Sequence, residues 1–157
     1  EVLSVILSGG KSSRLYENIV YKKQIALYAG GDYEGVCRDP NLFYFYASIA
    51  PGKKVEEVES ALYEEIEKLK NEQVTDRELE KAKNQLESSF IMGQDSVFYQ
   101  GMLLGRYETM SNWKLKDRYL EGIRKVTKED IQSVSKKYLI EDNRTVGILI
   151  PLSPKEP

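Results

Sequence analysis

Histidine is absent from the 157-residue sequence, and this absence excludes more chemistry than any other feature of the composition. Without histidine the chain has no Ser-His-Asp relay, no Cys-His pair, and neither the H-E-x-x-H nor the H-x-x-E-H zinc motif. Cys37 is the one cysteine, so a disulfide framework or a cysteine-rich zinc cluster within the chain is also excluded. We therefore predict that this chain contributes no catalytic residue, no metal ligand and no cofactor site.

Long apolar runs and an excess of basic residues are also missing. No stretch approaches the roughly 18 apolar residues of a membrane-spanning helix, so no membrane span is predicted. The 23 Lys and Arg residues against 25 Asp and Glu residues give a net charge of -2, which argues against a nucleic-acid partner. With 41% hydrophobic and 31% charged residues, the composition is typical of one folded domain. A single thiol is compatible with either the cytoplasm or the periplasm of a bacterium.

Strand signals are few and lie close together. Residues 27–34 and 42–50 are predicted strands, and the turn signal Asp39-Pro40-Asn41 between them indicates an antiparallel pair. Gly30-Gly31 suggests a bulge in the first strand, whereas the second is apolar on both alternating faces and is predicted to be central in its sheet. A third strand is predicted over residues 145–150 (TVGILI).

Helix signals fill most of the remaining chain. Residues 1–7 are predicted to form a short helix, with a strand as the alternative, and Ser12 or Ser13 is expected to cap a second helix running to about Ala26. The strongest apolar stripe lies in residues 55–69, with spacings of three and four. Capping patterns predict two helix starts, with Thr75 and Glu78 at one and Thr127 and Asp130 at the other. Together with the apolar spacing they predict a helix from residue 76, a helical continuation over 94–110 that is interrupted by Gly93, Gly101 and Gly105, and helices over 115–126 and 130–139.

Strands that cluster instead of alternating with helices favour an α+β fold, with a mostly antiparallel sheet and helices packed on one face. The sheet has few strands for so many helices, and we therefore expect further strands upstream of Glu1. The prediction is a single partial domain over residues 1–157, truncated at its N-terminus, with a polar tail at 152–157.

Four segments occur in one order along nearly the whole chain: LSGGKSSRLYENIVYKKQIAL, PGKKVEEVESALYEEIEKLKNEQVTDRELEKAKNQL, YLEGIRKVTKEDIQSVSKKYL and TVGILIP. The combination of G-x-S-S-R-L with V-T-x-x-E-L-x-x-A-K is the most specific part of this pattern. The sequence resembles the C-terminal, non-catalytic half of a subunit from the pitrilysin/insulysin family of zinc metallopeptidases, the inverzincins. Within that family it is similar in style to the mitochondrial processing peptidase and to small bacterial zinc proteases.

The resemblance implies two similar α+β halves that face each other around a closed chamber. The N-terminal half carries H-x-x-E-H, in which two histidines bind zinc and the glutamate activates water. This chain would then be the inactive peptidase domain, forming the chamber wall and a substrate-contact surface, with zinc in the other half. Peptide-bond hydrolysis is the activity implied for the parent protein. The implied partners are its own N-terminal half, a second subunit in a homo- or heterodimer, and a peptide substrate.

The resemblance also marks a departure at the substrate anchor. Many family members carry an arginine and, seven residues later, a tyrosine that hold the substrate backbone near the zinc. The matching positions here are Val20 and Leu27, whose side chains offer no hydrogen bonds. Tyr21 and Tyr28 are the nearby candidate substrate-binding residues. Because the arginine and tyrosine of the family are missing here, a second hypothesis stays open, in which the chain is a non-peptidase scaffold or partner subunit of the same fold.

Overall fold

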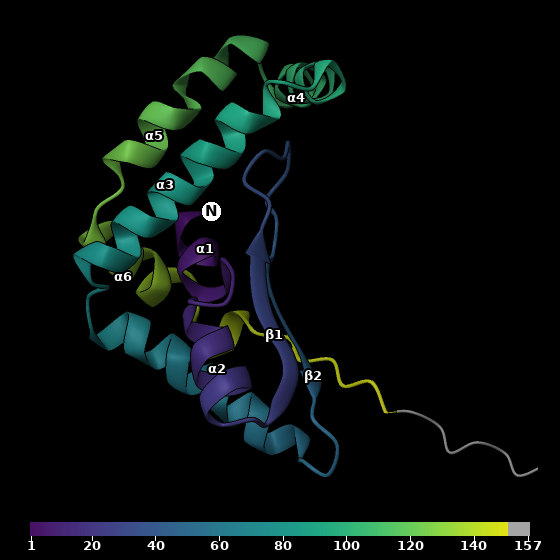
Figure 1. Cartoon of the computed structure of the whole chain (residues 1–157). Helices are drawn as coiled ribbons and strands as arrows, with labels where there is room; N and C mark the ends of the chain where they lie inside the picture. The colour runs from purple at the N-terminus through teal and green to yellow at the C-terminus, as the bar shows by residue number, and fades with distance from the viewer. Residues whose placement is uncertain (151–157) are drawn as a thin grey trace, which may run out of the picture.

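The computed structural model describes residues 1–150, and in this part of the chain helices pack on one face of a two-stranded sheet (Figure 1). The chain order begins α1 (Val2–Ser8), the π-helix η1 (Tyr16–Lys22), β1 (Ala26–Tyr33), β2 (Phe43–Ile49), α2 (Val55–Asn71) and α3 (Asp76–Gly93). It continues with α4 (Val97–Met110), the 3₁₀ helix η2 (Trp113–Arg118), α5 (Tyr119–Lys125), α6 (Lys128–Tyr138) and the 3₁₀ turn η3 (Glu141–Asn143). The predicted α+β class, with helices on one sheet face, is confirmed.

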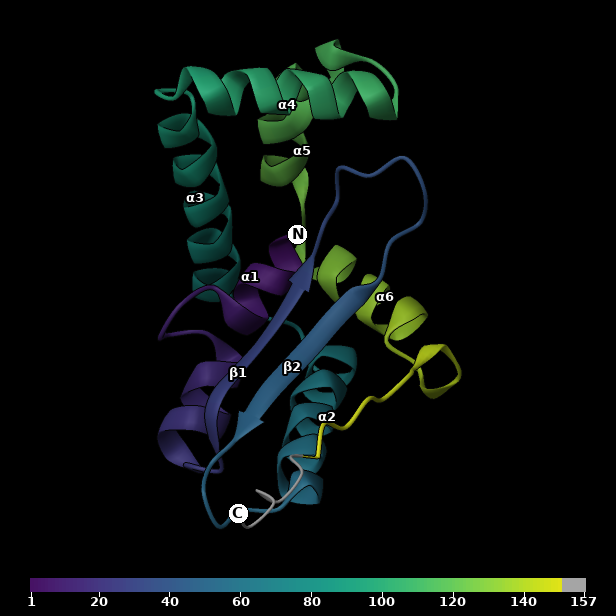
Figure 2. The same ribbon diagram turned by 90° about the vertical axis from the view of Figure 1, so that its right-hand side faces the viewer.

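The two faces of the sheet differ because the side chains of a strand alternate. β1 and β2 pair antiparallel, with Ala29 opposite Ala47 and Asp32 opposite Tyr44. Phe43, Phe45, Ala47 and Ile49 pack against the core, whereas the alternate residues of β2 are exposed. Figure 2 looks onto the exposed face, with α1, α2 and α6 lying behind the two strands. One face of the sheet is therefore open.

The core lies between the covered sheet face and the helices, and its largest fully buried side chains are Leu7, Leu15, Ile19 and Leu69. The stripe predicted in residues 55–69 places Val58, Ala61 and Ile66 of α2 in this buried layer. Both predicted capping boxes are formed: Thr75 with Glu78 at the start of α3, and Thr127 with Asp130 at the start of α6. Each satisfies backbone N–H groups that a helix start leaves without partners.

Three strand predictions were wrong in detail. β2 lies at an edge of a two-stranded sheet, so it is not central among residues 1–150. Residues 145–150 form no strand, and Leu149 is 95% exposed, because alternation of apolar residues cannot supply the hydrogen-bonded neighbour that a strand needs. The irregularity in β1 lies between Ala26 and Tyr28 and not at the two glycines. The predicted tail at 152–157 lies outside the described residues.

Helix boundaries also differ from the predictions. The second helix ends at Lys22, before the left-handed backbone of Gln24 (φ 51°), and the Ser13 hydroxyl donates to the carbonyl of Gly10 instead of capping the helix. The interruption expected at Gly93 is observed, since α3 ends there and α4 begins at Val97, whereas Gly101 and Gly105 lie inside the continuous helix α4. The ring of Tyr99 occupies the space that a side chain at Gly93 would need. Residues predicted as one helix over 115–126 divide into η2 and α5.

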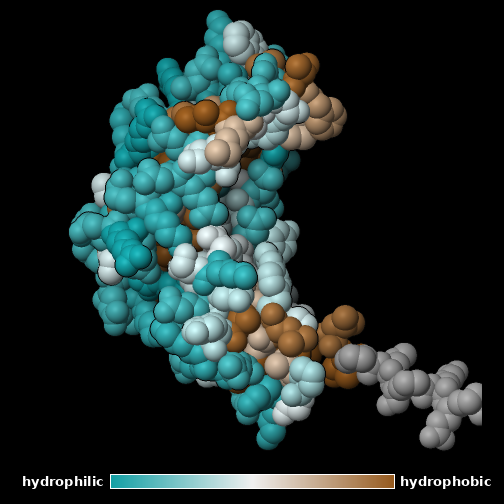
Figure 3. Space-filling view, in the orientation of Figure 1, coloured by the Kyte–Doolittle hydropathy of each residue, from teal (hydrophilic) through white to brown (hydrophobic). Residues whose placement is uncertain are grey.

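The break after α3 gives the molecule its hollow shape. α4 runs across the end of α3 and projects beyond the sheet on its open side (Figures 1 and 2). The space-filling view shows the resulting concave surface between α4 and the far end of the sheet (Figure 3). Among the described residues, no helix is long and apolar enough to cross a membrane.

Candidate functional site on the concave face

A stacked pair of tyrosines lies on the open face of the sheet. The rings of Tyr28 and Tyr46 have centroids 5.4 Å apart and an interplanar angle of 16°, and their hydroxyl oxygens lie 3.2 Å apart. A methyl group at Gly30 would come within 2.7 Å of the Tyr46 ring, so only glycine leaves room for this arrangement. Their shared hydrogen bond and partial burial raise the pKa of Tyr46 to about 12. The Tyr46 phenol is therefore neutral near pH 7, able to donate and accept hydrogen bonds.

The bulge in β1 determines which candidate anchor residue reaches this face. The register shifts between Ala26 and Tyr28, so that Leu27 and Tyr28 are both exposed. Leu27 is 63% exposed and is not part of the core. Val20, on η1, is partly buried and packs against the core. The Tyr28 side chain contacts Tyr46, whereas the Tyr21 side chain makes no hydrogen bond or ring stack with any residue in the described part of the chain. Of the two candidates, the structure brings only Tyr28 into a cluster.

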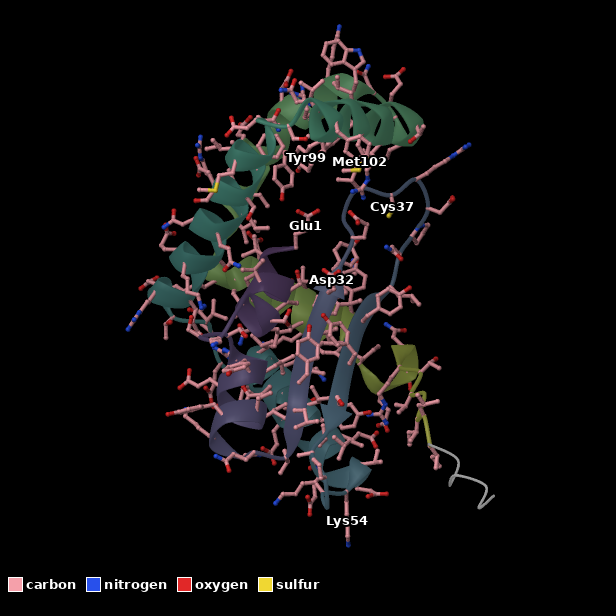
Figure 4. The ribbon with its side chains drawn as sticks, turned by 45° about the vertical axis from the view of Figure 1, so that its right-hand side comes forward. Glu1, Asp32, Cys37, Lys54, Tyr99 and Met102 are labelled. Carbon is pink, nitrogen blue, oxygen red and sulfur yellow. The ribbon has the colours of Figure 1, made fainter. Side chains whose placement is uncertain are left out.

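A second feature of the concave side is a cleft of ≈ 290 Å³, lined by both polar and apolar residues, where α1, the end of β1, α3 and α4 meet. Figure 4 shows Tyr99 extending from α4 toward Glu1, with Asp32 at the end of β1 below them. The Tyr119 hydroxyl donates to Glu1 Oε2 at 2.7 Å, and burial together with this carboxylate raises the pKa of Tyr119. Arg106 and Glu34, which both line the cleft, form an ion pair with each other.

Sequence reasoning missed both features for the same reason. Tyr28 and Tyr46 are 18 positions apart, and Glu1 and Tyr119 are 118 positions apart. The shared face of Tyr44 and Tyr46 was a usable signal, because alternation along a strand fixes it. The partner on β1 depends on a bulge whose position the sequence does not mark.

The residues of this chain do not fit a zinc ion. Structural and catalytic zinc sites use three or four ligands, mostly histidine and cysteine, and the sequence has 0 His and 1 Cys. In the part of the chain that the structure describes, no group of three or more His, Cys, Asp or Glu residues is arranged to hold a metal.

Known proteins share both the sequence pattern and the fold. A family model described as "Peptidase M16 inactive domain" matches residues 1–86. An uncharacterized zinc protease of Rickettsia felis is 33% identical over 138 residues, which cover 87% of this chain and 33% of that protein. The chain spans about a third of the length of the curated relatives it matches.

Two solved structures extend this likeness to three dimensions. A protease from Helicobacter pylori superimposes with a TM-score of 0.85 at 27% identity, covering 90% of this chain and 34% of the protease. The inactive peptidase domain of a putative zinc protease from Bordetella parapertussis shares the fold, with a TM-score of 0.88 at 24% identity, covering 99% of this chain and 82% of that domain. The resemblance to the pitrilysin/insulysin family is confirmed, and the chain belongs to the M16 zinc peptidases as an inactive peptidase domain.

Proposed function

We propose that this domain forms the non-catalytic wall of a peptidase chamber and that the open face of β1 and β2 contacts an extended peptide substrate. The zinc ion and the H-x-x-E-H residues would belong to a separate half that faces this wall, and the assembled enzyme would hydrolyse peptide bonds. Relatives named zinc proteases, three times as long as this chain, support a zinc-bearing partner half.

The observation that carries the proposal is the Tyr28–Tyr46 pair on an uncovered sheet face. Tyr44 lies on the same face of β2 and is 52% exposed, so three aromatic rings line one side of the hollow. Exposed rings bind apolar side chains, and phenol hydroxyls hydrogen-bond to peptide N–H and C=O groups. The face thus offers contacts that depend on an extended backbone more than on one particular side chain.

The direct test is to titrate the 157-residue chain with unstructured peptides and to measure binding from the changes in its NMR chemical shifts. We expect weak binding, with a Kd on the order of 0.1–1 mM, and shifts gathered on β1 and β2. Tyr46→Ala should abolish these shifts, whereas Tyr138→Ala on α6, also an exposed tyrosine, should leave them unchanged. Shifts that gather elsewhere, or that survive Tyr46→Ala, would contradict the proposed surface.

In the assembled enzyme, Tyr28→Phe is expected to lower kcat/KM, while Tyr21→Phe retains it, because only Tyr28 joins the tyrosine pair. Loss of one hydrogen-bond donor that acts in the transition state costs about 2.7–4 kcal/mol. The scaffold alternative rests on Val20 and Leu27, which lack the family's donors. The scaffold alternative is favoured if both variants keep the wild-type kcat/KM, or if the parent protein lacks H-x-x-E-H.

A further inference from the structure

The cleft between α1, the end of β1, α3 and α4 holds acidic and aromatic side chains that the proposed peptide contact on β1 and β2 does not use. Its volume of ≈ 290 Å³ is close to the lower limit of the about 300–1,000 Å³ typical of ligand pockets, which suits a small molecule or one long side chain. Arg106 is the only basic residue in its lining, beside the acids Glu1, Asp32 and Glu34. The lining therefore carries more acidic than basic side chains.

Two of these carboxylates have no counter-ion. Neither Glu1 nor Asp32 forms an ion pair with any described group, the α-amino group of Glu1 included. The Glu1 carboxylate is held in place, because Tyr119 donates to its Oε2 at 2.7 Å and a side chain at Gly35 would collide with its Oε1. Asp32 accepts the Tyr33 backbone N–H on Oδ1 at 2.8 Å. Each carboxylate thus keeps one oxygen that accepts no hydrogen bond from a described residue.

Tyr107 gives a separate indication of a ligand. The residue is only 5% exposed and lines the cleft, yet its hydroxyl makes no hydrogen bond with any described residue. Burial and the nearby Glu1 carboxylate raise the pKa of Tyr107, so this phenol is protonated at pH 7. Protein atoms do not enclose the hydroxyl oxygen completely. A buried polar group without a partner is destabilising, so the partner of this hydroxyl has to come from the cleft.

Aromatic rings form a further part of the wall. Phe90 of α3 and Tyr119 of α5 stack with ring centroids 5.0 Å apart, and Tyr99 extends from α4 toward Glu1 (Figure 4). Ring faces attract cations within about 6 Å of their centroids, and they also pack against the methylene groups of a long side chain. A metal ion fits poorly, because no group of three or more His, Cys, Asp or Glu residues in the described chain is arranged to hold one.

We propose that this cleft binds the ammonium or guanidinium head of an organic cation. The free oxygens of Glu1 and Asp32 accept its N–H groups and balance its charge, and the Tyr107 hydroxyl accepts a third hydrogen bond. An ammonium group has three N–H donors, which matches these three acceptors in number. The stem behind the head lies along the rings of Phe90 and Tyr119. Such heads occur on the lysine and arginine side chains of a peptide and on free aliphatic polyamines, which share this chemistry.

NMR titration of the 157-residue chain with n-butylammonium tests the site. We expect saturable shifts in residues that line the cleft, with a Kd on the order of 1 mM, and no such shifts with n-butanol, which has the same stem without the charge. The double variant Glu1→Gln/Asp32→Asn should raise this Kd at least about tenfold, because each amide oxygen keeps its present hydrogen bond but loses the charge. Glu72→Gln, at an exposed acid after α2 that forms no ion pair with a described residue, is the matched control and should leave the Kd unchanged.

Tyr107→Phe tests the buried hydroxyl by itself. It should raise the Kd about threefold, because one of the three acceptors is lost. Its thermal midpoint should not fall, since the hydroxyl has no protein partner among the described residues. A lower midpoint with an unchanged Kd would show that the hydroxyl serves the fold and not the ligand.

Two further ligands distinguish the sources of the head group. Tighter binding of an acetylated glycine peptide with one central lysine assigns the cleft to a peptide side chain, whereas tighter binding of spermidine assigns it to a free polyamine. The proposal is overturned if n-butylammonium causes no saturable shifts up to about 50 mM, if n-butanol causes the same shifts, or if the double variant binds as the wild type does. Tyr46→Ala, which removes the proposed peptide surface, should leave the Kd for n-butylammonium unchanged, so the two proposals fail separately.

Discussion

At the scale of single residues, Glu78 joins two parts of the chain. Its carboxylate accepts the backbone N–H of Thr75 at 2.8 Å and the Arg14 Nε–H at 2.6 Å. Burial acts to raise the pKa of Glu78, but the hydrogen bonds from Arg14 and Thr75 outweigh it and lower the pKa from 4.5 to about 2. The ionised carboxylate therefore stabilises both the start of α3 and the turn before η1.

We predict that Glu78→Gln lowers the free energy of unfolding by about 2 kcal/mol at pH 7. This is less than the pKa shift alone implies, because the Glu78 side chain is partly exposed and water screens its charge. Glutamine can still complete a capping box, so the loss reports the charge. Because the folded pKa lies below the unfolded one, the stabilisation is full above pH 4.5 and disappears as the pH falls through about 2. Urea unfolding of both proteins at several pH values measures the difference.

Asp130→Asn is the matched control for this prediction. Asp130 completes the other capping box, at Thr127, and forms no ion pair with any residue in the described part of the chain. Its replacement should therefore cost less, about 0.5 kcal/mol. Equal losses for the two variants would show that the Arg14 contact contributes nothing.

At the scale of elements, the β1–β2 hairpin depends on Gly30. Its missing side chain leaves room for Tyr46, with two ring carbons and the hydroxyl oxygen within 2.9 Å of where a methyl group would lie. The ring cannot keep both this position and its stack on Tyr28 if the methyl group is present. The open face is thus shaped by a glycine on the opposite strand.

We predict that Gly30→Ala lowers the free energy of unfolding by about 1–3 kcal/mol, the usual cost of overpacking. It should also bring the pKa of Tyr46 down from about 12 toward its usual value near 10, because the ring leaves the Tyr28 hydroxyl. NMR titration of the tyrosine ring signals measures the second effect. Gly147→Ala, where a methyl group meets nothing within 4 Å, should change neither property, and an unshifted Tyr46 in Gly30→Ala would refute the packing argument.

At the scale of the whole molecule, we predict that the purified chain retains less than about 0.1 zinc per chain after dialysis and cleaves no peptide bond. Three or four good zinc ligands are needed for a tight site, and the chain has 0 His and 1 Cys to offer. Elemental analysis and a peptidase assay measure the two outcomes, beside a full-length zinc protease as a positive control. About one tightly held zinc per chain would contradict the prediction.

Local chemistry determined much of this protein from sequence. The capping boxes at Thr75 and Thr127 and the stripe on α2 were predicted correctly, because each depends on side chains three or four positions apart. Composition argues against zinc ligation by this chain, and the G-x-S-S-R-L and V-T-x-x-E-L motifs indicated the family that the comparisons confirm. The site was only partly predicted, since Tyr28 was a candidate but its pairing with Tyr46 was not.

Tertiary structure decided what depends on residues far apart in the chain. The sequence of 145–150 has strand character, yet those residues form no strand, because the hydrogen bonds of a strand come from a neighbour. The spacing of Gly101 and Gly105 is typical of close helix packing, yet a methyl group at either position meets nothing within 4 Å among the described residues, because the path of the chain after α3 decides what lies beside α4. The same holds for the tyrosine pair, which a bulge at Leu27 and a glycine at position 30 together align. Periodicity fixes which way a side chain faces along its own element, and only the packing of elements fixes what it meets.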